Sequence, residues 1–213
     1  MIDANLVGEK NGRIYDRFRN RLMFPIIDVR GNVIGFGGRI IKKDTDSAKY
    51  LNSPETLIFN KRKNLFGLNL AKKSKENSLI LVEGNIDVIT LHQAGFDSAV
   101  ASLGTSLTAE HAQLLARYFQ QAVIAYDSDG AGVSAAQRAI PLLEKAGLKV
   151  RVLRMTGAKD PDEYIKKFGG TRFKKLIEQS AGSVEYELSK IGAKYDTETP
   201  EGKIAALKDA VGL

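Results

Sequence analysis

Two carboxylates follow a short apolar run in the middle of the chain, within the stretch AVIAYDSDGAG at residues 122–132. Asp127 and Asp129 stand two residues apart, so on an extended segment their side chains point the same way and can face one target. Like charges held so close repel each other unless a cation lies between them, and carboxylate oxygens are ligands that suit Mg²⁺. The alternative interpretation is a solvated turn in which Asp and Gly serve only the backbone.

A second acidic junction lies nearer the start of the chain. Glu83 follows the apolar run LILV at residues 79–82, and Asp87 lies four positions further on. That spacing is about one helical turn, so the Asp87 side chain can lean back toward the end of the strand. Both carboxylates are therefore candidates for one site.

A third junction follows a weaker apolar run at residues 150–155. Asp160 is a good helix N-cap, and Pro161 fits the first helical position, which places Asp162 in the first turn. The carboxyl ends of parallel strands meet at one edge of a sheet, where ligands bind in open α/β folds. We therefore expect the acids of all these junctions to converge.

The elements that must position these acids alternate between strand and helix from residue 77 onward. Short apolar runs bounded by turn residues are typical of buried strands in a parallel sheet. We predict strands at 79–82, 99–102, 123–126 and 150–155, helices between them at 86–94, 108–119 and 133–145, and further helices at 164–168, 171–179, 184–195 and 200–211. This alternation predicts an α/β fold with a mainly parallel sheet flanked by helices. Gly104 and Thr105 end one of these strands and either line the same cleft or form a plain turn.

The positive charge of the chain is concentrated in its first third. Residues 1–76 carry 16 Lys and Arg against 8 Asp and Glu, whereas residues 77–213 carry 16 against 17. A basic surface beside an acidic pocket suits a protein that presents cations to phosphates and carboxylates to a metal.

Three arginines in the basic part alternate with other residues. Arg17, Arg19 and Arg21 would share one face of a strand expected over residues 15–21, and such a row suits a nucleic-acid backbone. A solvated strand face is the competing interpretation.

A hairpin is expected next. The strands are predicted at residues 22–29 and 33–41, joined by a turn at 30–32, with Pro25 confined to an edge or a bulge. A charged loop is expected over residues 42–48.

The segment KYLNSPET offers several groups that can bind a nucleotide. Lys49 can bind a triphosphate, Tyr50 presents a stacking face, and Asn52 can form a hydrogen bond. Arg39, which follows paired glycines, can reach a phosphate. The basic run at residues 61–63 is either a second phosphate contact or a solvated loop.

These motifs resemble a known family. Glu83, Gly84 and Asp87 followed by Asp127 and Asp129 resemble the Toprim domain of topoisomerases, primases and related nucleases. The resemblance narrows to DnaG-type bacterial replicative primases through the segments DPD at 160–162, KYLNSPET at 49–56, RFRNRLMFPI at 17–26 and VIGFGGR at 33–39. It covers nearly all of the chain from about residue 14. The sequence departs from the family at residues 85 and 86, where Asn and Ile replace the more usual aromatic residue and Met.

The resemblance implies a DNA-dependent RNA polymerase that makes short RNA primers on single-stranded DNA for replication by metal-assisted nucleotidyl transfer from ribonucleoside triphosphates. Mg²⁺ is the expected cofactor, with Mn²⁺ able to replace it. The expected catalytic residues are Glu83, Asp87, Asp127 and Asp129, and the expected metal ligands are Glu83, Asp127, Asp129, Asp160 and Asp162. The residues expected to bind nucleotide or template are Arg17, Arg19, Arg21, Arg39, Lys49, Tyr50 and Asn52.

The polar stretch at residues 75–78 places a boundary near residue 76, and the resemblance implies the role of each part. Residues 1–76 would form a basic mixed α+β subdomain that contacts template and nucleotide, residues 77–168 the Toprim catalytic domain, and residues 169–213 a helical subdomain. A zinc module and a contact with the replicative helicase would lie in regions outside this sequence, and the protein would work in the bacterial cytoplasm.

Composition limits other classes of site. The chain has no Cys and two His, which excludes disulfides and cysteine zinc sites from this sequence. His92 and His111 are expected to be structural. No apolar run approaches the ~20 residues that cross a bilayer, so no membrane partner is expected.

Three alternative functions are compatible with the sequence. A Toprim nuclease or topoisomerase would cleave DNA strands, although KYLNSPET would then be unexplained. A phosphatase of the DxD type would use Asp127 as nucleophile, but such enzymes usually carry Thr or Val where Ala131 stands here. A Toprim module that binds DNA without catalysis would be expected to lose acids that this chain retains.

Overall fold

The structure is a computed structural model, and it describes residues 1–41 and 48–211. The loop expected over residues 42–48 lies mostly outside the described residues. The strands are β1 (Val7–Lys10), β2 (Arg13–Asp16), β3 (Arg21–Ile27), β4 (Val33–Ile40), β5 (Tyr50–Asn52), β6 (Ser78–Val82), β7 (Ala99–Ala101), β8 (Gln121–Ile124), β9 (Lys149–Val152) and β10 (Ala181–Gly182). The helices are η1 (Lys61–Lys63), α1 (Leu68–Ala71), α2 (Asn85–Gln93), α3 (Ala109–Leu115), α4 (Gly130–Lys145), α5 (Pro161–Glu178), α6 (Ser183–Lys194) and α7 (Pro200–Ala210).

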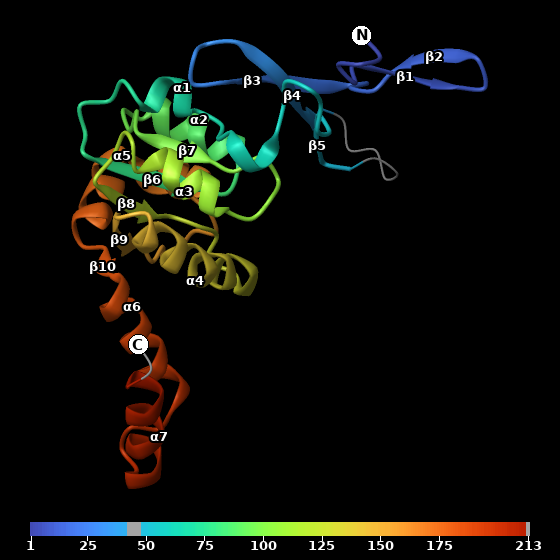
Figure 1. Ribbon diagram of the computed structural model, residues 1–213. Helices are drawn as coiled ribbons and strands as arrows, with labels where there is room; N and C mark the ends of the chain where they lie inside the picture. Colours follow the sequence, from blue (N-terminus) through green and yellow to red (C-terminus); the bar gives the residue numbers. More distant parts are fainter. Residues whose placement is uncertain (42–47, 212–213) are drawn as a thin grey trace.

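The central sheet has the strand order β10-β9-β8-β6-β7 (Figure 1). Strands β6 to β9 pair in parallel, and only the two-residue β10 runs antiparallel, against β9. The expected α/β fold with a mainly parallel sheet is confirmed. The strand ends that carry the acids therefore meet at one edge.

Strand β6 is buried on both of its faces. Leu79 and Leu81 pack into the apolar core formed with α3 and α4, whereas Ile80 and Val82 pack into the core formed with α2 and α5. All four side chains are at most 4% exposed. Burial on both faces explains why the sequence shows a continuous apolar run here, and it anchors the strand end that carries Glu83.

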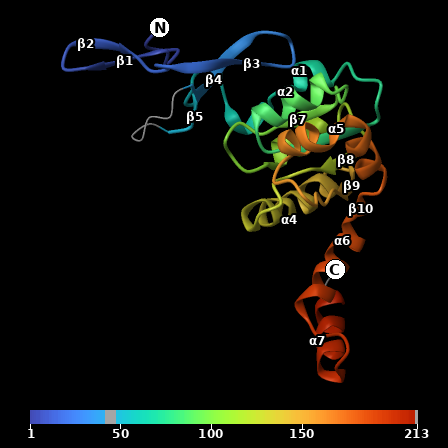
Figure 2. The ribbon, with the colours of Figure 1, turned by 180° about the vertical axis from the view of Figure 1, so that it is seen from behind.

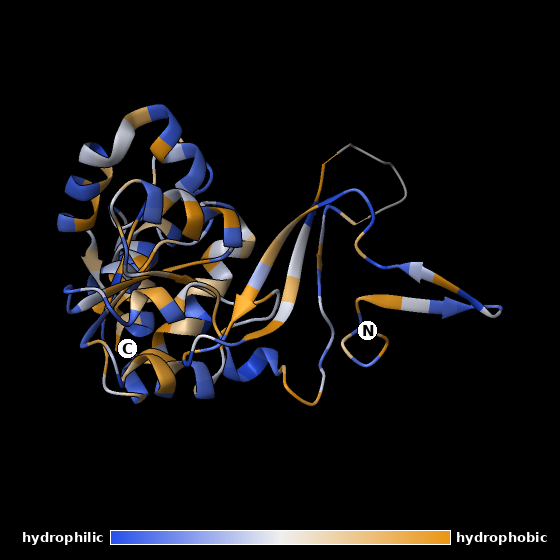
Figure 3. Ribbon diagram, turned by 90° about the horizontal axis from the view of Figure 1, so that it is seen from above, coloured by the Kyte–Doolittle hydropathy of each residue, from blue (hydrophilic) through white to orange (hydrophobic). Residues whose placement is uncertain are grey.

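The N-terminal residues form two small antiparallel sheets, β1-β2 and β3-β4-β5, that extend away from the helix-covered central sheet (Figures 2 and 3). The expected turn between β3 and β4 is present. The Asp28 carboxylate accepts hydrogen bonds from the backbone N–H groups of Arg30 (2.8 Å) and Asn32 (2.9 Å), and Gly31 adopts a φ of 97°. Pro25 lies on the edge strand β3, as expected.

The prediction of one strand over residues 15–21 is wrong. β2 ends at Asp16, β3 begins at Arg21, and the residues between them form a turn. The Asp16 carboxylate accepts a hydrogen bond from the backbone N–H of Phe18, and Asn20 adopts a φ of 53°. Short polar side chains stabilise such turns. Arg17, Arg19 and Arg21 therefore do not form a row on one strand face.

The two helices predicted at residues 164–168 and 171–179 correspond to the two parts of α5. Its backbone is non-helical at Gly169, with a φ of 78°, which marks a kink between the two parts. Beyond the kink, Phe173 is fully buried against the sheet, and β10 then pairs with β9. Packing onto the sheet thus continues past residue 168, and α6 and α7 extend away from it (Figure 1). No helix in the described ranges is both long and apolar enough to cross a bilayer.

Candidate active site

A cleft of about 400 Å³ opens where the carboxyl edge of the central sheet faces β4 and β5. The structure brings most of the expected site residues together there. The charged, aromatic and amide side chains that line the cleft are Arg39, Lys49, Tyr50, Asn52, Glu83, Asn85, Asp87, Asp127, Lys159, Asp160 and Asp162.

Four expected residues do not line this cleft. Arg17 donates a hydrogen bond to Asn5 (2.7 Å), and Arg21 donates one to the Gly38 carbonyl (3.3 Å). Arg19 lies in the turn before β3. Asp129 is the N-cap of α4, where its Oδ1 accepts a hydrogen bond from the backbone N–H of Gly132 (2.9 Å).

Glu83 and Asp127 come from neighbouring strands and touch each other. Glu83 follows β6, and its Oε1 accepts a hydrogen bond of 3.1 Å from the backbone N–H of Asp127, which lies beyond β8. Helix α4 begins close against both residues. A Cβ atom at Gly132 would lie 2.1 Å from the Asp127 carbonyl oxygen and 2.9 Å from Glu83 Oε1, so only glycine permits this approach.

The charges of these two carboxylates are unfavourable in the free protein. Burial raises the pKa of Glu83, and the Asp127 charge raises it further. Burial also raises the pKa of Asp127, with the Asp160 charge adding to the effect. Lys159, whose Nζ lies 3.8 Å from Asp127 Oδ2, acts in the opposite direction. A bound cation would relieve this excess of negative charge.

Asp87 leans back toward the strand end, as its spacing predicted. Its Oδ2 accepts a hydrogen bond from the backbone N–H of Gly84 (3.2 Å), and its Oδ1 accepts one from the backbone N–H of Asp162 (3.1 Å). The residue is 8% exposed, and burial raises its pKa to about 7 despite the opposing hydrogen bond from Asp162. Asp87 thus joins the start of α2 to the start of α5.

The two acids of the DPD segment have different surroundings. Asp160 is the N-cap of α5, as expected, and its Oδ1 accepts a hydrogen bond from the backbone N–H of Glu163 (2.8 Å). Asp162 accepts hydrogen bonds of 2.6 Å from Thr90 and from Lys166. Burial raises the pKa of Asp162, but these hydrogen bonds outweigh burial and lower it overall. The Lys166 contact could have been predicted from its i,i+4 spacing.

The cations across the cleft lie around one aromatic ring. Arg39 Cζ lies 5.9 Å and Lys49 Nζ 5.6 Å from the centre of the Tyr50 ring. Asn52 has a structural contact, because its Nδ2 donates a hydrogen bond of 3.1 Å to the Leu103 carbonyl beyond β7. This bond fixes β5 against the central sheet. The presence of Lys159 in the cleft was not predicted, although its position directly before the DPD segment could have indicated it.

Both histidines have the structural role that was expected. His111 is fully buried and its Nε2 hydrogen-bonds the Lys61 carbonyl at 2.7 Å. His92 Nε2 hydrogen-bonds the Ala99 carbonyl at 2.9 Å. Neither histidine lines the cleft.

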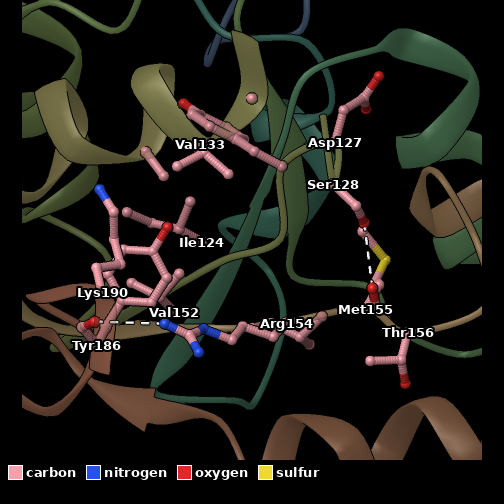
Figure 4. Close-up of a pocket in the computed structure, with 14 residues that line it drawn as sticks. Ile124, Asp127, Ser128, Val133, Val152, Arg154, Met155, Thr156, Tyr186 and Lys190 are labelled. Atoms are coloured by element: carbon pink, nitrogen blue, oxygen red, sulfur yellow. Dashed lines mark hydrogen bonds between the residues drawn. The ribbon is translucent and has the colours of Figure 1, made fainter. Parts of the chain in front are cut away.

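A neighbouring cavity of about 310 Å³ shares Asp127 with the cleft. Figure 4 shows Asp127 at one end of it and Arg154, Tyr186 and Lys190 at the other. Arg154 and Lys190 lie 5.0 and 5.8 Å from the centre of the Tyr186 ring, and Arg154 also donates a hydrogen bond to the Tyr186 carbonyl. These contacts tie the cationic end of this cavity to α6.

The donor set of the cleft fits a hard divalent cation. Among the described residues, no group of three or more His, Cys, Asp or Glu side chains is arranged to hold a metal ion by itself. Mg²⁺ commonly takes one or two carboxylates and completes its shell with substrate phosphates and water. Glu83 and Asp127, adjacent and with raised pKa values, match that smaller requirement.

Comparisons with known proteins agree with this geometry. Residues 1–72 match the family described as the DNA primase catalytic core, N-terminal domain, and residues 80–165 match the Toprim-like family. A DNA primase from Clostridium acetobutylicum is 44% identical over 210 residues, which are 98% of this chain and 35% of that protein. The chain therefore spans about a third of the length of the curated relatives it matches.

Solved structures show the same fold. A DnaG catalytic core is 41% identical with a TM-score of 0.84, and the match covers 99% of this chain and 68% of that one. A DnaG primase catalytic domain bound to single-stranded DNA is 42% identical with a TM-score of 0.84, and the match covers 96% of this chain and 67% of that one. The resemblance expected from the sequence is confirmed: this chain belongs to the DnaG primase family.

Proposed function

We propose that this chain carries the nucleotidyl-transfer centre of a primase that makes short RNA primers on single-stranded DNA. The observation that carries the proposal is the cleft itself, in which Arg39 and Lys49 of the basic subdomain face Glu83 and Asp127 of the sheet edge. Cations and a divalent metal are what a triphosphate requires, and phosphoryl transfer depends mostly on positioning and charge stabilisation. A nuclease would not require a cationic wall for a triphosphate.

Glu83 and Asp127 are the residues proposed to hold Mg²⁺, with Mn²⁺ able to replace it. Asp129 and Asp160 lie close enough for their charges to raise the pKa of Asp127, and we include both as candidate ligands, with Asp162 as a further candidate. The metal supplies positive charge to the phosphate oxygens when bound. Asp87 is proposed to keep α2 and α5 in register, so that the other carboxylates converge.

Arg39, Lys49 and Lys159 are proposed to hold the triphosphate. During transfer the 3′ oxygen of the strand forms a bond to the α-phosphorus, and the bond from that phosphorus to the bridging oxygen breaks. Pyrophosphate leaves with the electron pair, and the hydroxyl proton passes to water. The cations stabilise the charge that accumulates on the leaving group.

Partners follow from the same proposal. A relative is described as a primase catalytic domain bound to single-stranded DNA, and single-stranded DNA is the template proposed here. Ribonucleoside triphosphates are the proposed substrates. The replicative helicase and a zinc module are proposed to act with this chain through regions outside this sequence. The protein is proposed to work in the bacterial cytoplasm. Residues 1–76 are proposed to bind template and nucleotide, residues 77–168 to carry catalysis, and residues 169–213 to form a helical subdomain.

The test is RNA synthesis by the 213-residue chain on a single-stranded DNA template with ribonucleotides and Mg²⁺ or Mn²⁺. Template-dependent short RNA on a sizing gel is the expected product, with Asp127→Asn as the inactive control. Cleavage of the template without synthesis would favour a Toprim nuclease. Release of phosphate from a phosphomonoester would favour a phosphatase.

A further inference from the structure

A second cavity, of about 320 Å³, lies on the other flank of Glu83. Glu83, Ser102 and Gly104 line both this cavity and the cleft, so the two spaces adjoin at the strand ends. The proposed activity has so far used only the cleft. The cavity brings one further cation, Arg138 of α4, to the same carboxylate edge.

Several side chains that can donate hydrogen bonds line this cavity, beside Leu107 and three alanines. Ser102, Thr105 and Ser106 come from the loop after β7, where Gly104 has a φ of 75° that turns the chain sharply. Their hydroxyls and the Arg138 guanidinium are groups that bind phosphate oxygens. Glu83 supplies the acidic wall on the side of the proposed metal.

Arg138 is held in position by its helix, and its guanidinium is accessible to a ligand. It is exposed, while its neighbour Ala139 is 1% exposed and packs in the core, so the side chain projects from a rigid helix. Within residues 1–41 and 48–211, no carboxylate lies within ion-pair distance of its guanidinium. Arg154 in the cavity beyond Asp127 differs, because it is hydrogen-bonded to α6.

We propose that the Arg138 cavity binds a phosphodiester of the strand that carries the attacking 3′-hydroxyl. This proposal rests on the proposed nucleotidyl transfer, in which attacking and leaving oxygens are roughly in line across the phosphorus. Arg39 and Lys49 lie in the cleft between the two subdomains, so the leaving pyrophosphate belongs there. The attacking strand then approaches from the other flank of Glu83, where the Arg138 cavity opens.

Arg138→Gln tests the proposal, with Arg117→Gln as matched control. Arg117 is exposed and lies after α3, close to the amino-terminal end of β8 and so at the opposite edge of the sheet. Extension is measured by varying a short oligoribonucleotide at saturating template and ribonucleotide. We expect the KM for the oligoribonucleotide to rise about tenfold in Arg138→Gln, as for loss of one charge-assisted contact. The KM for ribonucleotide stays unchanged, and Arg138→Lys recovers part of the loss.

A binding measurement separates this proposal from the proposed activity. The salt dependence of oligoribonucleotide binding, followed by fluorescence anisotropy, should become shallower by about 0.7 in the log–log slope when Arg138 is replaced, as expected for one single-strand phosphate contact. If the slope differs in this way between wild type and the Arg138 variant but the wild-type chain makes no RNA, the proposed activity is refuted and the subsite is supported. An unchanged slope, or a KM increase for template or ribonucleotide instead of the oligoribonucleotide, would overturn the subsite.

Discussion

The acidic sheet edge and the basic β3-β4-β5 sheet meet in one cleft but are built differently. Glu83 and Asp127 follow strands that are buried on both faces, and Asp87 and Asp160 already accept backbone hydrogen bonds. The cations Arg39 and Lys49 extend from an antiparallel sheet and lie around Tyr50. Replacing an acid therefore changes both the scaffold and the chemistry, whereas replacing one of these cations changes binding alone.

The largest effect is expected for Asp127→Asn, which separates the catalytic role of this acid from its effect on stability. In Asp127→Asn the primer yield should fall by at least about 10²-fold, as when one preorganised electrostatic contact is lost. Without metal the same variant should unfold at an equal or higher temperature, because burial and the Asp160 charge disfavour the ionised Asp127. Primer assays and metal-free thermal scans measure both, with Glu178→Gln as control. Wild-type primer yield would remove Asp127 from the site.

Asp129 provides a sharper test, because its carboxylate caps α4 through Gly132. Asn is as good an N-cap as Asp, whereas Ala lacks the cap and costs about 1 kcal/mol of stability. We expect Asp129→Asn to keep its melting temperature but to bind Mn²⁺ more weakly and lose most primer synthesis. Asp129→Ala should lose stability as well. Normal activity in Asp129→Asn would limit Asp129 to capping.

The basic side should respond in binding only. Arg39→Ala and Lys49→Ala are each expected to raise the KM for ribonucleotide about tenfold, since charge-assisted phosphate contacts are stronger than neutral ones. The melting temperature should not change, and the effect should diminish as salt screens the charges. Lys61→Ala, in η1 and outside the cleft, is the matched control. A drop in melting temperature in Arg39→Ala would show that the cations also support the fold.

The contrast between the regions also explains what the sequence could predict. The apolar run at residues 79–82 and the spacing from Glu83 to Asp87 depend on local pattern, so the strand and the convergence of acids were predictable. The alternating arginines led to the wrong prediction of a strand over residues 15–21, because alternation does not distinguish a strand from a turn stabilised by Asp16. Strand β10 was missed since two residues carry no periodicity.

Contacts between distant segments cannot be predicted from local sequence patterns. The hydrogen bond from Asn52 to Leu103 joins the basic subdomain to the sheet across 51 positions. The shared wall at Glu83, with the cleft on one flank and Arg138 on the other, depends on how α4 packs. Neither relation produces a local sequence pattern, whereas buried strands and helix caps do.

The smallest expected effect concerns an acid in the basic subdomain. Asp28 is buried, but the backbone N–H of Asn32 lowers its pKa from 3.8 to about 2, outweighing burial, and the Asn32 side chain and Arg30 N–H assist. Asp28 is thus the reverse of Glu83, whose pKa is raised. A carboxylate with a lowered pKa stabilises the fold above its unfolded pKa, and this stabilisation is lost as the pH falls through the folded pKa. Asp28→Asn should therefore be less stable than wild type at neutral pH, with the difference in urea midpoints shrinking as the pH falls through 3.8 and vanishing below about pH 2. A difference that stays constant over this range would mean that the shape of the turn, rather than the Asp28 charge, supports the hairpin.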